Sequence, residues 1–252
     1  PHIVYALYTD GYYYAGLYKS EDFGSSWIQT DPGEQIAQGT ASFSWYFGQI
    51  RVHPNNPDIV FAMDVAFMRS TDGGNSWPII YGYGGPSILH VDHHALAFHP
   101  ENPEYIINGN DGGINISTNG GVSFTKVADL PVNQFYEIGI NMNNPEKLYG
   151  GTQDNGTLRT QTGALDDWDR IWGGDGFYVI VTPNSNPTEI YAESQFGNLV
   201  KSNNDGDYFY YCMDGIGGEP TNWSTPVAMD PNNYNVLYYG TDRVYRTENS
   251  AG

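Results

Sequence analysis

Short runs of apolar and polar residues alternate along the whole chain, and Gly, Pro, Asn and Asp separate one run from the next. Residues 48–53 (Gly-Gln-Ile-Arg-Val-His) and 177–181 (Phe-Tyr-Val-Ile-Val) are typical of these runs. A period of two places alternate side chains on opposite faces of a strand, and no stretch keeps the longer period of a helix. The pattern therefore predicts an all-β chain of short strands and tight turns.

One motif recurs, with the form Ser/Thr-x-Asp/Asn-x-Gly-x-x-aromatic. An Asp or Asn side chain accepts hydrogen bonds from the backbone of its own turn, and Gly adopts the positive φ that such a turn needs. The acidic or amide residue is therefore expected to be structural. The copies span residues 19–27, 69–77, 116–124 and 201–209, with Asp22, Asp72, Asn119 and Asn204 at the turn, and a fifth copy starts at Arg246.

A turn, centred on Pro in most copies, precedes each motif and leads into a short apolar strand. Anchors for this turn at positions 1, 57, 103, 145, 187 and 234 give spacings of 56, 46, 42, 42 and 47 residues. Propeller blades of four strands repeat at roughly 40–50 residues. We therefore expect a β-propeller of four-stranded antiparallel blades. About six repeat units fill residues 1–252 as one domain, the first and last blades are incomplete, and the domain is part of a larger ring or chain.

The same repeat predicts where the large aromatic residues lie, because one follows each motif and opens the fourth strand of its blade. In one blade, residues 160–163 (Thr-Gln-Thr-Gly) replace a proper motif, so this blade is degenerate. The residues expected in equivalent buried positions are Trp27, Trp77, Phe124, Trp168 and Phe209.

The charge of the chain excludes two classes of partner. The formal net charge is −19, with only ten Lys and Arg. Binding to nucleic acid or to an anionic membrane surface depends on clustered basic residues, so both are excluded. No apolar run is long enough to cross a membrane, so no membrane insertion is expected. Neutral polymers such as polysaccharides, and basic proteins, remain as partners. Few Lys beside abundant Asn, Asp, Tyr and Gly is typical of an extracellular surface.

The motif resembles the Asp-box repeat, also called the bacterial neuraminidase repeat, of sialidases, sortilin-type receptors and xyloglucanase-type glycoside hydrolases. Residues 92–100, 150–156 and 172–177 resemble more closely the large secreted bacterial repeat proteins of sortilin-like or glycosyl-hydrolase-like type. The resemblance covers essentially the whole chain. It implies the propeller fold and a secreted or cell-surface protein with further domains, but no particular activity, because enzymes and binding proteins share this corner.

Two sets of loops are expected to converge on one face of the predicted blades, namely the loops before the first strands and the hairpins between the second and third strands. Together they combine aromatic rings, carboxylates and amides, as a carbohydrate-binding cleft does. The alternative is that the Gly-rich loops are tight hairpins and the rings belong to the core. The candidate ligand-binding residues are Trp45, Asp92, His93, Tyr136, Asp154, Asp175 and Trp223.

Catalysis is a separate question. Xyloglucanase-type enzymes use two Asp residues, one as general acid and one as base. Asp64 and Asp111 match the pattern of those enzymes loosely and are the catalytic candidates, although a partner propeller is absent from these residues. A sialidase needs three clustered Arg, and the characteristic Arg-containing start of sialidases is not visible. We therefore favour a non-catalytic binding or assembly module whose ligand is a polysaccharide or an extracellular protein, with a glycoside hydrolase as the alternative.

No cofactor is expected from the sequence. Asp92, His93 and His94 form the one candidate metal cluster, since His and carboxylate are suitable ligands for Zn²⁺. Adjacent residues of a strand point to opposite faces, so the two histidines share an ion only if they lie in a loop. The acidic hairpins alternatively offer oxygen ligands to Ca²⁺, although no complete calcium-loop spacing is present.

Overall fold

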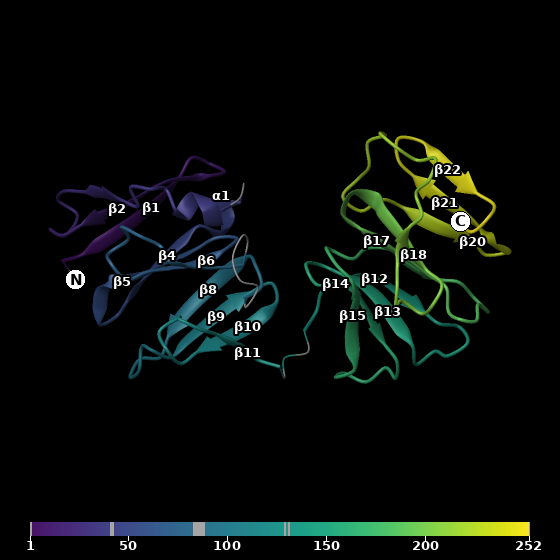
Figure 1. Cartoon of the computed structure of the whole chain (residues 1–252), viewed down its shortest axis with the longest axis horizontal. Coiled ribbons are helices and arrows are strands. Elements are labelled where there is room, and N and C mark those ends of the chain that lie inside the picture. Colours follow the sequence, from purple (N-terminus) through teal and green to yellow (C-terminus); the bar gives the residue numbers. More distant parts are fainter. Residues whose placement is uncertain (1, 41–42, 83–88, 129, 131, 252) are drawn as a thin grey trace. The chain divides into compact units, whose positions relative to one another are not determined.

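The structure, a computed structural model, describes residues 2–40, 43–82, 89–128, 130 and 132–251. It is all-β and contains six small antiparallel sheets of three or four strands (Figure 1). Contacts within the chain divide it into two compact units, residues 1–130 and 131–252, and each unit is described by itself. Pro1 and Gly252, which belong to the first predicted anchor and the last predicted motif, lie outside the described residues.

The first unit contains three sheets in which consecutive strands pair antiparallel. The first sheet has β1 (Val4–Thr9), β2 (Tyr14–Ser20) and β3 (Ile28–Thr30). The second has β4 (Gln49–His53), β5 (Asn56–Met63), β6 (Phe67–Ser70) and β7 (Ile79–Tyr81). The third has β8 (His93–Phe98), β9 (Ile106–Asn110), β10 (Gly113–Ser117) and β11 (Thr125–Lys126). Two short helical turns, η1 (Ile36–Gly39) and α1 (Ser44–Phe47), lie between the first two sheets in sequence.

The second unit repeats this design with two four-stranded sheets and one three-stranded sheet. The fourth sheet has β12 (Phe135–Ile140), β13 (Leu148–Thr152), β14 (Gly156–Thr160) and β15 (Trp168–Trp172). The fifth has β16 (Val179–Val181), β17 (Ile190–Ser194), β18 (Asn198–Ser202) and β19 (Tyr210–Tyr211), with the helical turn η2 (Gln195–Gly197) between β17 and β18. The sixth has β20 (Val227–Asp230), β21 (Asn233–Gly240) and β22 (Val244–Thr247). No helix of the described residues is long and apolar enough to span a membrane.

The recurring motif forms a corner that is held by one hydroxyl and one carboxylate or amide. In the first sheet, Ser20 Oγ donates to Asp22 Oδ1 and accepts the backbone N–H of Gly24, both at 2.8 Å. Asp22 Oδ1 also accepts the N–H of Ser26 at 2.8 Å. The same three bonds recur in three other sheets, around the pairs Ser70 and Asp72, Ser117 and Asn119, and Ser202 and Asn204. The predicted turn chemistry is confirmed.

Glycine is required in the corner for two reasons. Gly74 and Gly121 have φ of 86° and 80°, a region that residues with a Cβ rarely adopt. A Cβ on Gly121 would also lie 2.8 Å from the Phe61 ring of the preceding sheet. The glycine therefore closes the turn and admits a neighbouring side chain.

The fourth sheet forms its corner with a residue that the motif does not contain. The Thr160 hydroxyl donates to the carboxylate of Asp167, which also accepts the N–H of Thr162 at 2.9 Å. Thr160 Oγ1 accepts the N–H of Gly163 at 2.9 Å. Asp167 thus replaces the missing acidic residue from further along the chain, and the bonds of the corner are kept although its sequence pattern is lost.

Three of the five aromatic residues predicted to be buried after the corners are buried, and two are not. Trp77, Phe124 and Phe209 are buried, and Trp77 packs with Leu17 of the preceding sheet. Trp27 is 43% exposed, because no sheet precedes its own within residues 2–251. Trp168 is half-buried, with its ring centroid 5.5 Å from that of Phe135. The prediction of equivalent burial was therefore wrong for these two residues.

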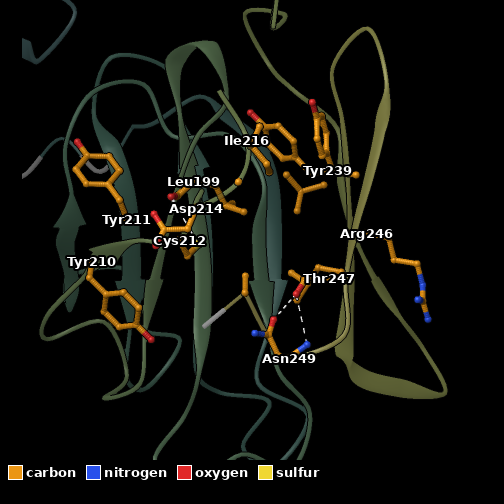
Figure 2. A pocket seen from close by; sticks show the side chains of 15 residues that line it. Leu199, Tyr210, Tyr211, Cys212, Asp214, Ile216, Tyr239, Arg246, Thr247 and Asn249 are labelled. Carbon is orange, nitrogen blue, oxygen red and sulfur yellow. Dashed lines mark hydrogen bonds between the residues drawn. The ribbon is translucent and has the colours of Figure 1, made fainter. Parts of the chain in front are cut away.

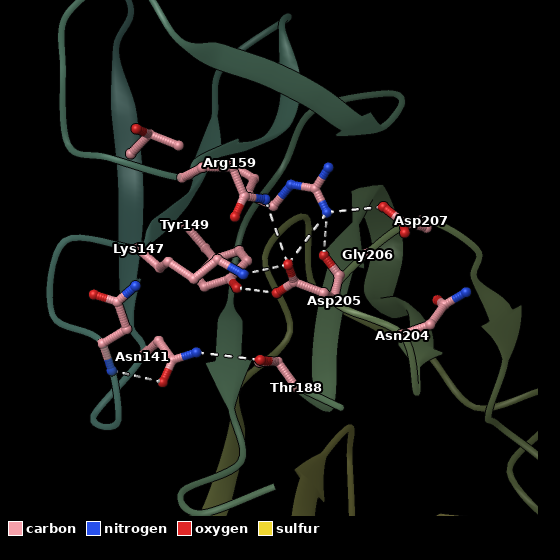
Figure 3. Close-up of polar contacts among 12 residues, drawn as sticks. Asn141, Lys147, Tyr149, Arg159, Thr188, Asn204, Asp205, Gly206 and Asp207 are labelled. Carbon is pink, nitrogen blue, oxygen red and sulfur yellow. Dashed lines mark hydrogen bonds and ion pairs between the residues drawn. The ribbon is translucent and has the colours of Figure 1, made fainter. Parts of the chain in front are cut away.

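Neighbouring sheets within a unit are connected by a cross-strand pair that joins an aromatic to a basic residue. Figure 3 shows this contact between the fourth sheet and the corner of the fifth. Tyr149 of β13 faces Arg159 of β14 in register. The guanidinium of Arg159 donates to the backbone carbonyl of Asp205, the Tyr149 hydroxyl donates to the Asp205 carboxylate, and Lys147 pairs with the same carboxylate. The fourth sheet thereby fixes the corner of the fifth.

The same arrangement connects other sheets inside each unit. Arg69 of β6, in register with Phe61, donates to the carbonyl of Gly120 at 2.7 Å. Lys201 of β18, in register with Tyr191, donates to the carbonyl of Ser250 at 2.8 Å. Each acceptor directly follows the Asn of a corner in the next sheet. The basic residue that precedes the corner in one sheet therefore binds the corner of the sheet that follows.

We expect Asp72→Ala to lower the free energy of unfolding by about 1 kcal/mol, the usual cost of losing a side-chain cap. The carboxylate accepts bonds from Ser70 and Ser76, and alanine removes them. Asp72→Asn is the matched control, because Asn119 and Asn204 hold the same bonds. Urea unfolding measures the free energy of unfolding of both variants. Equal destabilisation by Ala and by Asn would contradict the view that the acceptor oxygen at position 72 stabilises the turn.

In the fourth sheet, Asp167→Ala is expected to lower the melting temperature, whereas Asp166→Ala leaves it near the wild-type value. Asp167 accepts the bonds of the corner, and its exposed neighbour Asp166 has no bond to the corner among the described contacts. Differential scanning calorimetry of the two variants gives the comparison. Equal melting temperatures would contradict the assignment of Asp167 to this corner.

Candidate functional site

Four aromatic rings meet at one end of the second unit and form the aromatic row, which consists of Tyr136, Phe177, Trp223 and Phe196. The rings of Tyr136 and Phe177 have centroids 4.7 Å apart and are inclined by 31°. Trp223 contacts Phe177 edge-on at 5.7 Å and Phe196 at 5.1 Å. Phe177 is 1% exposed, whereas Tyr136, Trp223 and Phe196 are 38%, 44% and 59% exposed. The row therefore has a buried base and three accessible rings.

The topology explains why these residues meet. Tyr136 lies at the start of β12, Phe177 lies two residues before β16, Trp223 precedes β20, and Phe196 lies in the hairpin between β17 and β18. In an antiparallel meander, the loop before the first strand and the hairpin between the second and third strands lie at the same end of the sheet. A backbone hydrogen bond of 3.1 Å from the N–H of Phe196 to the carbonyl of Trp223 joins the fifth and sixth sheets there.

Two predicted acidic residues lie beside this row. Asp175 is buried, accepts a hydrogen bond of 2.9 Å from the side-chain amide of Gln195, and forms a bridge to Gly156. The pKa of the Tyr136 hydroxyl is raised, first by burial and then by the negative charges of Asp175 and Asp154. Tyr136, Asp175 and Trp223 therefore lie near one another in this unit, and Asp154 is close enough for its charge to act on the Tyr136 hydroxyl.

A buried carboxylate supports two of the loops that hold the row. Glu193 is fully buried on β17, and its Oε1 accepts the N–H of Thr225 at 2.5 Å. Its Oε2 lies 3.4 Å from the N–H of Tyr178. Thr225 and Tyr178 are close in sequence to Trp223 and Phe177. Burial raises the pKa of Glu193 to about 7, although the two backbone donors lower it. Glu193 was not predicted as a site residue from the sequence. The signal that could have found it is a carboxylate within an apolar strand, because such a group is costly to bury without partners.

The first unit contains a second group of candidates, the Asp92 cluster, formed by His90, Asp92, His94 and Asp111. His94 Nε2 lies 2.5 Å from Asp111 Oδ1, and the N–H of Asp111 lies 3.3 Å from the Asp92 carbonyl. Burial, and then the neighbouring Asp111 carboxylate, raise the pKa of Asp92 to about 6, while His90 and His94 lower it. Asp111 thus neighbours both Asp92 and His94.

Trp45 lies on α1, next to this cluster. It is 58% exposed, and its ring centroid lies 5.6 Å from that of Tyr46, which in turn contacts the His94 ring at 5.9 Å. The side-chain amide of Gln49 donates to the His94 carbonyl at 2.9 Å. Exposed rings and polar groups are therefore combined in the first unit as well.

His93 and Asp64 differ from their neighbours because they are buried. His93 is fully buried on β8, its Nδ1 lies 3.0 Å from Asn108 Oδ1, and burial lowers the pKa of its imidazole to about 4. Asp64 is 2% exposed, and its Oδ1 accepts the N–H of the next residue, Val65, at 2.7 Å. Both side chains are therefore shielded from solvent, and the His93 ring packs against Phe67.

The metal candidates are separated by this placement. His93 is enclosed in the core, whereas His94 pairs with Asp111. Within the described residues of either unit alone, no three His, Cys, Asp or Glu residues place one ligand atom each within 4.8 Å of one another. A zinc site of three protein ligands needs such a cluster. Asp92, His93 and His94 therefore lack the arrangement of a preformed zinc site.

No model of a known protein family matches the chain, and no curated protein matches it. Among solved structures, the chain is similar to a GH74 enzyme of Niastella koreensis, with 18% identity over 98% of this chain and 43% of that one and a TM-score of 0.40. A GH74 xyloglucanase from Xanthomonas campestris matches at 15% identity over 99% and 42%, with a TM-score of 0.35. YCF48 from Cyanidioschyzon merolae matches at 13% identity over 99% and 92%, with a TM-score of 0.34.

The chain spans less than half the length of the two GH74 proteins. Identities and TM-scores of this size establish no shared activity, so the function has to be argued from the residues of this chain.

Stability is expected to depend on pH through Glu193. Its pKa of about 7 in the folded chain exceeds the 4.5 of the free side chain, so folding favours the protonated form. Its contribution to stability is therefore full below about pH 4.5 and is lost as the pH rises through 7. Glu193→Gln removes this loss, so the stability of the variant relative to that of the wild type is expected to rise by on the order of 3 kcal/mol between pH 4.5 and pH 8.

Chemical unfolding at a series of pH values measures this difference. Glu137→Gln is the matched control, because Glu137 is exposed on β12 of the same unit. A parallel pH dependence of the wild type and Glu193→Gln would disprove the role of Glu193.

Proposed function

We propose that the six sheets are blades of an Asp-box β-propeller over residues 1–252, and that this module binds a neutral polysaccharide as part of a secreted, extracellular protein. Six antiparallel sheets of three or four strands are consistent with blades. Four of them have the same hydrogen-bonded corner, which supports a common repeat. The acidic, Lys-poor composition supports an extracellular location.

The observation that carries the proposed activity is the aromatic row with its polar neighbours. Flat rings stack on the apolar faces of sugars, while amides and carboxylates bind hydroxyl groups. Tyr136, Trp223 and Phe196 offer accessible rings, and Asp154, Asp175 and Gln195 lie beside or below them. In the first unit, Trp45 and the Asp92 cluster offer a similar combination. The charge of −19 favours a neutral chain over an acidic one, because like charges repel.

Binding is favoured over catalysis by the placement of Asp64. A glycoside hydrolase needs two carboxylates that reach the substrate from a cleft, about 5–10 Å apart. Asp64 is 2% exposed, and its Oδ1 accepts the N–H of Val65. Asp111 is partly exposed and paired with His94. The candidate pair for a xyloglucanase-type mechanism therefore has only one member near solvent.

Trp223→Ala is expected to weaken the affinity for a soluble neutral β-glucan about tenfold, since it removes an exposed ring from the row and a stacked ring contributes on the order of 1 kcal/mol. Isothermal titration calorimetry measures this change. Tyr208→Ala is the matched control, because Tyr208 is an exposed aromatic residue of the same unit that lies in the corner of the fifth sheet.

Three outcomes would contradict the proposal. Equal loss of affinity in both variants would place the ligand away from the row. Release of reducing sugar by the wild type, abolished by Asp64→Asn or by Asp111→Asn, would establish the glycoside hydrolase instead. Binding of basic extracellular proteins without any affinity for glucans would change the ligand class to protein.

A further inference from the structure

Glu193 connects three of the segments that carry the aromatic row. Its backbone carbonyl accepts the N–H of Phe177 at 3.0 Å. Its Oε1 accepts the N–H of Thr225, two residues after Trp223, at 2.5 Å. Phe196 lies three positions after Glu193, in the helical turn that follows β17. The supports of three rings of the row therefore meet at one buried residue.

The loop that carries Trp223 depends on this carboxylate for its place. Thr225 Oγ1 donates to the Asn222 carbonyl at 3.0 Å, so these two residues close a turn around Trp223. The Trp223 carbonyl accepts the N–H of Phe196 at 3.1 Å. The bond from Thr225 to Glu193 then fixes the turn to β17. We call this arrangement, with the Thr225 N–H on Glu193, the closed row.

The surroundings of the Glu193 side chain are apolar. Its register partner on β18 is Leu199, and register partners place their side chains next to each other on one face of a sheet. Leu199 and Tyr239 of β21 line the space between the fifth and sixth sheets (Figure 2). Among the ion pairs of residues 132–251, none includes Glu193. The carboxylate is thus enclosed with backbone N–H groups as its described donors.

The charged and titratable groups on the elements around Glu193 have other partners. Asp175, in the loop before β16, accepts a bond from Gln195, and Lys201 on β18 pairs with Glu189 at 2.9 Å. Residues 222–228, which lead into β20, contain no charged side chain. On β21, burial raises the pKa of the Tyr239 hydroxyl, and the negative charge of Glu193 raises it further. None of these groups supplies a positive charge to the Glu193 carboxylate.

The second unit contains no histidine, because all six histidines of the chain lie between residues 2 and 99. Histidine is the side chain that ordinarily changes its charge near neutral pH. In this unit Glu193 does so instead, because burial raises its pKa to about 7, although the N–H groups of Thr225 and Tyr178 lower it. A charge therefore appears near neutral pH at the point where the supports of the row meet.

We propose that Glu193 regulates the aromatic row, so that the closed row binds its ligand while Glu193 is protonated and loses it as the carboxyl ionises. The inference rests on the glycan binding proposed above. An enclosed charge without a cation is costly, and water reaches it once the Thr225 bond breaks and the Trp223 loop moves away. Apparent affinity follows the fraction of molecules in the binding-competent arrangement. Affinity is therefore highest below pH 7 and falls as the pH rises through 7.

Isothermal titration calorimetry of a soluble neutral β-glucan on the 252-residue chain, at pH 5.5 and pH 8.5, tests this. The wild type is expected to bind about fivefold more weakly at pH 8.5. Glu193→Gln keeps an acceptor oxygen for Thr225 but does not ionise, so its affinity is expected to change by less than about twofold. Glu146→Gln, at an exposed position in the turn before β13, is the matched control and keeps the pH dependence of the wild type.

A second measurement needs no ligand and no Glu193 variant. The difference in tryptophan emission between the wild type and Trp223→Phe reports on the Trp223 ring, and it is expected to change with a midpoint near pH 7. An emission difference that stays constant from pH 5.5 to pH 8.5 would overturn the proposal. Equal wild-type affinity at the two pH values would also do so, as would an unchanged pH dependence in Glu193→Gln that near-ultraviolet circular dichroism shows to be folded. Absence of glucan binding at both pH values would instead contradict the proposed function, and the emission of Trp223 would still decide whether Glu193 controls the row.

Discussion

The bond between a corner hydroxyl and its acidic or amide partner is the interaction on which the rest of this structure depends. Ser70 Oγ accepts the N–H of Gly74 and donates to Asp72, so one side chain fixes both ends of the turn. The closed turn then orients Trp77 toward the preceding sheet, where it packs in a buried cluster. Without a defined corner, the fourth strand has no fixed start and its aromatic residue has no fixed place in the core.

The corner also explains why this chain contains so many Asn, Asp and Ser residues: these side chains hold its turns. Asn119 and Asn204 replace Asp without loss of the bonds, because only the acceptor oxygen is needed. The carbonyl that follows the Asn of a corner accepts a bond from the preceding sheet, as at Gly120 and Ser250. Polar residues at these positions therefore connect sheets as well as close turns.

Much of the fold can be predicted from the sequence, because the period-two pattern and the turn chemistry are local. The all-β class, the short antiparallel sheets and the corner bonds are confirmed. Asp167 was not predicted, because it reaches the corner of Thr160 from seven residues along the chain and lies outside the motif. Trp27 was predicted to be buried and is not, because burial depends on a neighbouring sheet, which local sequence does not report.

The site could be predicted only in part, for the same reason. Meander topology makes the proximity of Tyr136 and Trp223 foreseeable, since their loops lie at one end of the sheets. Whether a residue of such a loop faces solvent or the interior depends on packing across sheets, which separates buried Asp64 and His93 from partly exposed Asp111 and His94. Glu193 supports the aromatic row through contacts to residues 15 and 32 positions away in sequence, which no local pattern reports.

The pairing of Arg69 with Gly120 and of Lys201 with Ser250 gives the contacts between sheets a direction along the chain. The second, fourth and fifth sheets each donate to the corner of the sheet that follows, so the free-energy coupling within a unit runs between nearest neighbours, as in a linear repeat array. The cooperativity of unfolding in such an array is limited by the weakest contact between neighbouring sheets, and not by the total apolar area that the sheets bury. In the third sheet, Ile107 and Ile116 occupy the paired positions and have no side-chain donor. At these two positions the third sheet therefore lacks the basic side chain that the second, fourth and fifth sheets use to bind a following corner.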